Sequence, residues 1–227
     1  MTPETQPFVV TISRQLGSGG GFMGERLSAR LKAMYLDREI LSHAAEKLKV
    51  SEDELESLDE KTTPFWQSIL ISSNYAAPSL FTPPPAGIFP SDHDLIRVET
   101  EIITHVAEKN TAVIVGRGGS YILRDHPRHA SLYLYADISV RCQRVQAKYK
   151  LPVDKALKMI EDNDKARSRY LHNVTGFDWS DARQYHLCIN TGALELPKIE
   201  KLVIEYLQFR FGPLELASIP DPVKPGI

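Results

Sequence analysis

Five residues near the start of the chain, Gly17-Ser-Gly-Gly-Gly21, constrain the fold more than any other feature. The β-branched run Phe8–Ser13 precedes them, and apolar residues at helical spacing follow them: Met23, Leu27, Leu31 and Met34. In a strand–loop–helix unit, backbone N–H groups converge on an anion at the positive end of the helix dipole. The pattern predicts a phosphate-binding loop made by Gly17, Ser18, Gly19, Gly20 and Gly21. The structural alternative is a flexible turn, or tight packing of the helix on the strand.

Apolar runs alternate with helical patterns along the rest of the chain. The predicted strands after the first are Tyr35–Leu36, Thr111–Val115, Ser131–Ala136 and His186–Asn190. Helices are predicted at about 94–109 and 153–170, and a last one ends at Gly212-Pro213. Prolines between 78 and 90 indicate an extended loop within a mostly helical segment. Five apolar strands alternating with helices favour an α/β fold with a parallel sheet covered on both faces.

Composition excludes several classes of function. The chain has 227 residues, enough for one domain, with 42% hydrophobic residues, 25% charged residues and a net charge of −2. This balance gives no support for a nucleic-acid or membrane-surface partner, and no apolar run reaches membrane-spanning length. The polar start carries no secretory signal, so a cytoplasmic location is expected. No residues have metal-ligand spacing that favours a metal site, and a homo-oligomer is left open.

Four segments in one order resemble the cytidylate kinase-like family. They are Ile12–Gly21, Tyr35–Glu39, Val113–Gly118 and Asp164–Arg167, and the resemblance runs from about Val9 to Leu207. It implies a P-loop NTPase-type three-layer α/β/α sandwich, with a five-stranded parallel sheet in the order 2-3-1-4-5. It also implies a single domain with a phosphate-loop unit at 8–44, a helical acceptor-side insertion at 45–105 and a lid at 150–180.

The glycine loop departs from the loop of authentic cytidylate kinases. Gly17 and Gly19 match loop glycines, but Gly20 stands where the phosphate-binding lysine is expected. Gly21 replaces a small or hydroxyl residue, and Arg14 replaces the first glycine. Because the lysine bridges the β and γ phosphates, its loss is expected to cost about a hundredfold or more in rate unless another cation replaces it. Arg14 is the best substitute and Arg26 a poorer one.

The resemblance also implies an acceptor site. Asp37 matches an acidic residue near the monophosphate pocket, Arg38 occupies the adjacent position, and His43 replaces a pocket arginine. Arg117 matches the arginine that touches the monophosphate, while Gly118 replaces an aspartate. These departures alter the part of the pocket that would select CMP, so the acceptor cannot be read from the sequence.

Further charged residues come from the second half of the chain. Asp164 and Arg167 match an aspartate–arginine pair on the lid helix, and Arg141 and Arg144 match arginines of the helix before it. Arginines suit this chemistry because guanidinium groups bind phosphate oxygens bidentately. Arg14, Arg117, Arg167 and Asp164 are therefore the predicted catalytic residues. Arg141 joins the glycine loop in binding nucleotide.

Two functions follow from the resemblance. The first is ATP-dependent phosphoryl transfer to a nucleoside monophosphate such as CMP, or to a related small molecule, with Mg²⁺ bound mainly through the ATP phosphates. The second is a nucleotide-binding regulatory protein without kinase activity. The missing lysine favours the second function, whereas Asp37, Arg117, Asp164 and Arg167 favour the first.

Overall fold

A computed structural model describes residues 6–38, 40–41 and 92–220. Several predictions lie outside these residues: most of the insertion at 45–105, the Pro-rich segment at 78–90, and His43.

Five parallel strands form a single sheet in the order β2-β3-β1-β4-β5, which confirms the predicted order. Their bounds are β1 Val9–Arg14, β2 Met34–Leu36, β3 Ala112–Val115, β4 His129–Tyr135 and β5 Leu187–Asn190. The central strand β1 is in register with both neighbours, so that Val9 lies between Ala112 and His129. The carboxyl ends of β1 and β3 therefore lie side by side, where open parallel sheets bind ligands.

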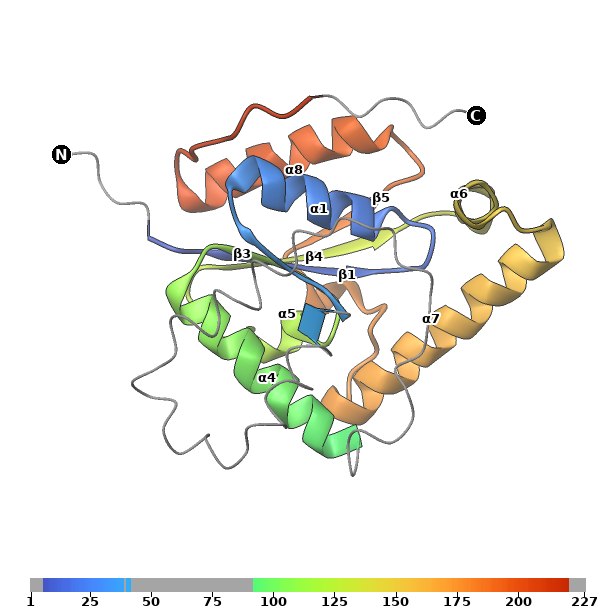
Figure 1. The fold of residues 1–227 in the computed structure, drawn as a ribbon, viewed down its shortest axis with the longest axis horizontal. Coiled ribbons are helices and arrows are strands. Elements are labelled where there is room, and N and C mark those ends of the chain that lie inside the picture. Colours follow the sequence, from blue (N-terminus) through green and yellow to red (C-terminus); the bar gives the residue numbers. More distant parts are fainter. Residues whose placement is uncertain (1–5, 39, 42–91, 221–227) are drawn as a thin grey trace.

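Helices cover both faces of the sheet, which confirms the three-layer α/β/α fold. The helices α1 (Gly20–Leu31) and α8 (Leu196–Phe211) cover one face, while α4 (Asp92–Lys109) and α5 (Gly119–Ile122) cover the other (Figure 1). Side chains along the strands alternate between the two faces of the sheet: Val10 and Ile12 pack toward α1 and α8, whereas Val9 and Ile114 pack toward α4. Each face thus has its own apolar core.

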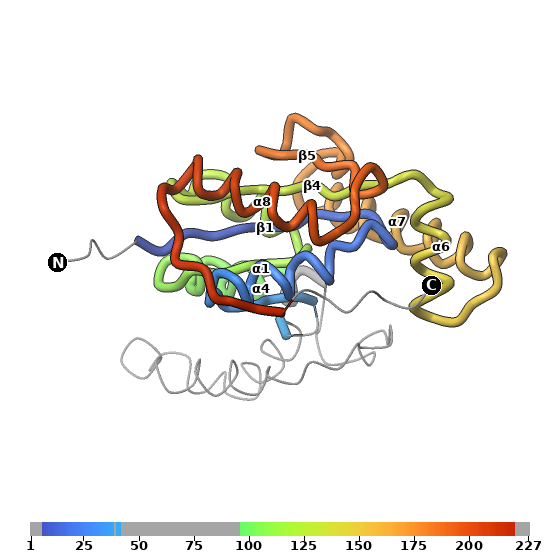
Figure 2. The backbone as a smooth tube through the Cα atoms, turned by 90° about the horizontal axis from the view of Figure 1, so that it is seen from above, coloured from blue at the N-terminus to red at the C-terminus, as the bar shows by residue number. Residues whose placement is uncertain are grey.

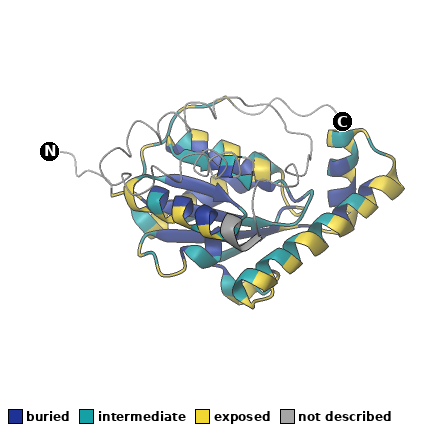
Figure 3. Ribbon diagram, turned by 60° about the horizontal axis from the view of Figure 1, so that its bottom comes forward, coloured by how far each residue is buried: buried dark blue, intermediate teal, exposed yellow. Residues whose placement is uncertain are grey.

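Two further helices extend beyond the carboxyl edge of the sheet. They are α6 (Ile138–Tyr149) and α7 (Val153–Thr175), which pack on each other through Cys142, Val145, Ala156 and Ile160. Seen from above, α6 and α7 project past the end of β1 (Figure 2). The outward face of α7 is largely exposed (Figure 3). A short 3₁₀ helix, Ala182–Gln184, follows α7 and leads into β5.

No helix within the described ranges combines the length and apolar content needed to cross a bilayer.

Candidate functional site

A cavity of about 220 Å³ lies where the carboxyl ends of β1 and β3 meet α7. Four arginines from four separate segments line it, together with aromatic and small residues. Its lining consists of Ser13, Arg14, Arg38, Val115, Gly116, Arg117, Gly118, Asn163, Ala166, Arg167, Tyr170, Leu171 and Trp179. The structure therefore brings together four of the predicted site residues: Arg14, Arg38, Arg117 and Arg167.

Arg14 crosses the space that a loop lysine would occupy. A Cβ atom at Gly20 would lie 2.5 Å from Cγ of Arg14, and a side chain at Gly116 would collide with the Arg14 guanidinium. Burial, followed by the charge of Arg167, lowers the pKa of Arg14 to about 9, so the guanidinium stays protonated at neutral pH. Arg26 points elsewhere: its Nε lies 2.6 Å from Glu200 Oε2.

Arg117 is held by two residues that sequence reasoning missed. Its Nη2 lies 2.6 Å from Oε1 of Glu99 on α4, and its guanidinium lies 5.3 Å from the ring centroid of Tyr170 on α7. The Tyr170 hydroxyl donates to Glu99 Oε2 at 3.4 Å. A signal for Glu99 exists in the sequence, since it shares the apolar stripe of its helix with Ile102 and Val106.

Asp164 connects α7 to the glycine loop and to two arginines. Its Oδ1 accepts a hydrogen bond from the Leu16 N–H at 2.9 Å, and its Oδ2 pairs with Arg141 Nη1 at 2.5 Å. Arg167 lies 3.5 Å from Asp164 Oδ1 and also donates to the carbonyl of Arg14 at 3.4 Å. Arg141 lies under the loop, where it also donates to Leu16 O. Asp164 therefore holds the start of the loop through the Leu16 N–H, and it is not among the residues that line the cavity.

The glycine loop is packed closely on the protein. Gly17 and Gly19 have φ values of 82° and 85°, which favour glycine. A Cβ atom at Gly17 would lie 2.7 Å from the Arg141 carbonyl, and one at Gly19 would lie 2.7 Å from Leu196. Tight packing, the structural alternative for the glycine cluster, therefore explains why glycine is needed at positions 17 and 19.

Two loop positions retain features of an anion site. Gly20 and Gly21 form the first turn of α1, and the described residues supply no acceptor for their N–H groups. Gly21 is exposed, with no heavy atom within 4 Å of a Cβ built there. Ser18 differs from both, since its buried hydroxyl donates to Gln15 O at 2.8 Å and shapes the loop.

Asp37 and Arg38 follow β2 at the same edge of the sheet. Asp37 Oδ1 accepts a hydrogen bond from the Ile40 N–H at 3.2 Å, and Arg38 lines the cavity. Asp37 lies close enough to influence the titration of both Tyr35 and Arg14. Among the described residues, no three His, Cys, Asp or Glu side chains gather as a metal site.

Two cavity residues lay outside the predicted site for different reasons. Trp179, an uncharged aromatic residue, lines the cavity while its ring packs against Tyr133. Asn163 lies one residue before Asp164, but its polar side chain carries no charge signal. Arg144 is not among the lining residues of the cavity; its Nη1 donates to the carbonyl of Gly17 in the loop at 3.4 Å and to Thr191 Oγ1 at 3.0 Å.

Comparison with known proteins places these residues in a family. A family model described as the cytidylate kinase-like family matches residues 9–193. Cytidylate kinase of Sulfurisphaera tokodaii is 28% identical over 113 residues, which cover 50% of this chain and 62% of that protein. Cytidylate kinase of Saccharolobus islandicus is 23% identical over 127 residues, which cover 56% and 64%. The chain thus spans less than two thirds of the length of these curated relatives.

The fold also has a solved counterpart. An uncharacterized protein of Eubacterium ventriosum superimposes with a TM-score of 0.67 at 22% identity, covering 89% of this chain and 99% of that one. This likeness supports the fold alone.

Proposed function

This chain belongs to the cytidylate kinase-like family, and on that premise we propose that it transfers a phosphoryl group from ATP to a small acceptor that carries a phosphate. Nucleoside monophosphates of the cytidylate type are the first candidates. The observation that carries the proposal is the convergence of Arg14, Arg38, Arg117 and Arg167 on one cavity beside the glycine loop. Phosphoryl transfer depends on positioning and on positive charge around the transferred group, and guanidinium groups provide both.

The donor would bind at the glycine loop. The N–H groups at the first turn of α1 suit the ATP phosphates, because they combine hydrogen-bond donors with the positive end of the helix dipole. Mg²⁺ bound to the phosphates would neutralise part of their charge and orient them. Arg14 would supply the cation that the missing lysine provides in related loops, since its chain crosses Gly20 toward the cavity.

The acceptor would bind in the cavity itself. Arg38 and Arg117 suit the phosphate of the acceptor. Arg167 also lines the cavity, and its Nη1 donates to the Arg14 carbonyl at 3.4 Å. Segment 150–180, which contains α7, would act as the lid that excludes water, a competing phosphoryl acceptor. Asp164 would hold the loop rather than touch the reacting atoms, because its oxygens bond Leu16 and Arg141.

The test is a transfer assay with ATP and Mg²⁺ against a panel of nucleoside monophosphates, nucleosides and other phosphorylated small molecules. We expect turnover with at least one phosphate-bearing acceptor and none with the matching dephosphorylated compound. ATP binding by calorimetry without transfer to any member of the panel would assign the regulatory function instead. An absence of both binding and transfer would contradict the proposal.

A further inference from the structure

We infer that Glu99 and Tyr170 are positioning residues that hold the Arg117 guanidinium in the cavity wall, so that it receives the anionic group of the acceptor. The inference rests on the proposed function, since it concerns how the same cavity recognises a phosphate. Neither residue belongs to the site expected from the sequence, and both act through Arg117.

The three side chains come from three segments and contact one another. Arg117 follows β3, Glu99 comes from the middle of α4, and Tyr170 comes from the last third of α7. Oε1 of Glu99 pairs with Nη2 of Arg117 at 2.6 Å, and Oε2 of Glu99 accepts a hydrogen bond from the Tyr170 hydroxyl at 3.4 Å. The Tyr170 ring lies against the guanidinium, 5.3 Å from centroid to Cζ. The guanidinium thus has a carboxylate and an aromatic face as partners, and each fixes a different direction.

The backbone at Arg117 indicates that this position is held under constraint. Gly116, Arg117 and Gly118 have consecutive φ values of 85°, 53° and 68°. The left-handed region suits the glycines but is strained for an arginine. The pair with Glu99 and the contact with Tyr170 are interactions that can compensate for this strain.

Glu99 is the most buried carboxylate of the described residues, with 1% of the residue exposed. Burial raises its pKa to about 6, while Arg117, Tyr170 and Arg38 act in the opposite direction. A buried carboxylate is costly to keep, and its cost is offset here by charge pairing with an arginine that lines the cavity. Its charge also lowers the mutual repulsion among the four guanidinium groups at the cavity.

The same contacts connect Arg117 to the helix that carries Arg167. Tyr170 and Arg167 are three residues apart on α7, so their side chains lie on one face of the helix, and both line the cavity. Any displacement of α7 would move Tyr170 and Arg167 together, and it would separate Tyr170 from Glu99 and Arg117. The contacts of Tyr170 therefore couple the position of Arg117 to that of the helix that carries Arg167.

The test uses inorganic phosphate as the probe in a calorimetric titration, in parallel with KM and kcat for the best acceptor. Glu99→Gln is expected to weaken phosphate binding and raise KM about tenfold or more, with a smaller change in kcat. Tyr170→Phe keeps the ring but loses the 3.4 Å hydrogen bond to Glu99, so it should cause a smaller loss than Tyr170→Leu, which should resemble Glu99→Gln. The matched control is Glu101→Gln on the same helix, where the side chain is 61% exposed and pairs with Arg97; it should change nothing.

A double-mutant cycle separates positioning from a merely structural role. If Glu99 acts through Arg117, then Glu99→Gln should add no further loss of phosphate affinity to Arg117→Ala. Additive losses, or a fall in melting temperature with unchanged phosphate affinity, would overturn the inference while leaving the proposed function standing. If Glu99→Gln does not fold, the Tyr170 variants make the same distinction. A folded wild-type protein that binds no phosphate and transfers none would overturn both.

Discussion

At the scale of single residues, Arg14 and Gly20 share one volume. The Arg14 side chain passes within 2.5 Å of where a Cβ atom at Gly20 would lie, and its guanidinium reaches Gly116. A lysine at position 20 and an arginine at position 14 therefore exclude each other in this backbone. The absence of the lysine and the presence of the arginine are one structural change, not two.

Gly20→Ala tests this shared volume. The added methyl group collides with Arg14 and should lower the free energy of unfolding by about 1–3 kcal/mol, as overpacking does. Gly21→Ala is the matched control, because position 21 is open and alanine favours a helix, so it should stabilise by up to about 1 kcal/mol. Urea unfolding measures both. In an Arg14→Ala background, which removes Cγ but keeps the Cβ atom 2.8 Å away, the cost of Gly20→Ala should fall without vanishing; an unchanged cost there would contradict the account.

Sequence reasoning found the cavity arginines because each follows a strand or lies on the helix that the family resemblance marks. It missed Glu99, whose position on the apolar stripe of α4 was the available signal. It also missed Tyr170, since an aromatic residue near the end of a helix usually packs in a core. Contacts between α4, β3 and α7 decide both roles, and such contacts are not visible along the chain.

At the scale of elements, the predicted strands were confirmed because each is a short apolar run in a parallel sheet, buried in the three central strands and partly buried in the edge strands β2 and β5. The short helix α5 was missed, since its start at Gly119 follows glycines that read as a loop. The helix α7 runs five residues beyond the expected Tyr170 and ends at Thr175, where Gly176 caps it with φ 74°. The cap residue, not the periodicity, sets that end.

Asp164→Asn tests the fastening of α7 to the glycine loop. The change keeps the shape but removes the charge that pairs with Arg141, whose side chain is only 10% exposed. We expect a loss of several kcal/mol of stability, since breaking a buried pair leaves a charge uncompensated. Hydrogen exchange of the Leu16 amide should also accelerate. Asp162→Asn on the same helix, with its side chain 59% exposed beside Lys158, should stay within about 0.5 kcal/mol; equal effects would refute the role of Asp164.

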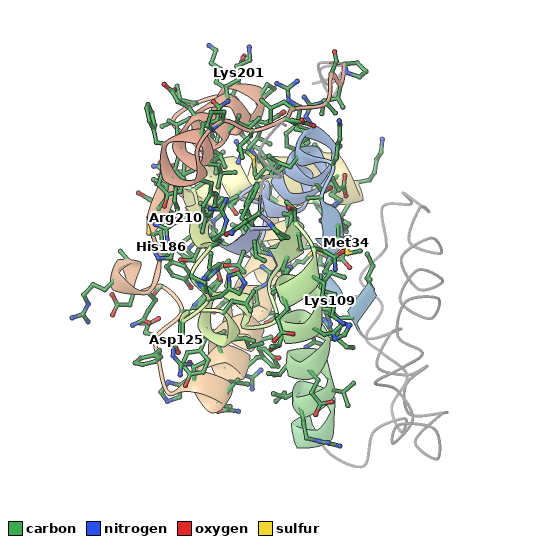
Figure 4. The ribbon with its side chains drawn as sticks, turned by 90° about the vertical axis from the view of Figure 1, so that its left-hand side faces the viewer. Met34, Lys109, Asp125, His186, Lys201 and Arg210 are labelled. Atoms are coloured by element: carbon green, nitrogen blue, oxygen red, sulfur yellow. The ribbon has the colours of Figure 1, made fainter. Side chains whose placement is uncertain are left out.

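At the scale of the whole molecule, the edge of the sheet away from the cavity carries a buried histidine. His129 is 1% exposed, with Nε2 2.7 Å from Thr11 Oγ1. The centroids of the His129 and His186 rings are 5.6 Å apart, and Nη2 of Arg210 donates to the backbone carbonyl of His129 at 2.7 Å. Figure 4 shows the His186 and Arg210 side chains next to each other at this edge. Burial, followed by His186, lowers the pKa of His129 to about 3.

This histidine makes the stability of the whole domain depend on pH. Between about pH 6.5 and 3 the unfolded chain binds a proton at His129 that the folded protein does not, so stability falls as the pH falls through this window. The slope attributable to one such group is at most about 1.4 kcal/mol per pH unit. His129→Gln, which can still bond Thr11, should flatten the profile measured by urea unfolding. His172→Gln, at an exposed position on α7, should not; identical profiles for wild type and His129→Gln would exclude this source.

The central claim is that Arg14 supplies the cation of the lysine-less loop, and a comparison of Arg14→Ala with Arg26→Ala tests it most directly. The measurement is the single-turnover rate of phosphoryl transfer from ATP, alongside the melting temperature of each variant. Arg14→Ala should lower the rate about a hundredfold or more. Arg26→Ala removes the contact with buried Glu200, so it should lower the melting temperature and leave the rate within about threefold of wild type. Equal losses of rate in the two variants, or an unchanged rate in Arg14→Ala, would contradict the claim.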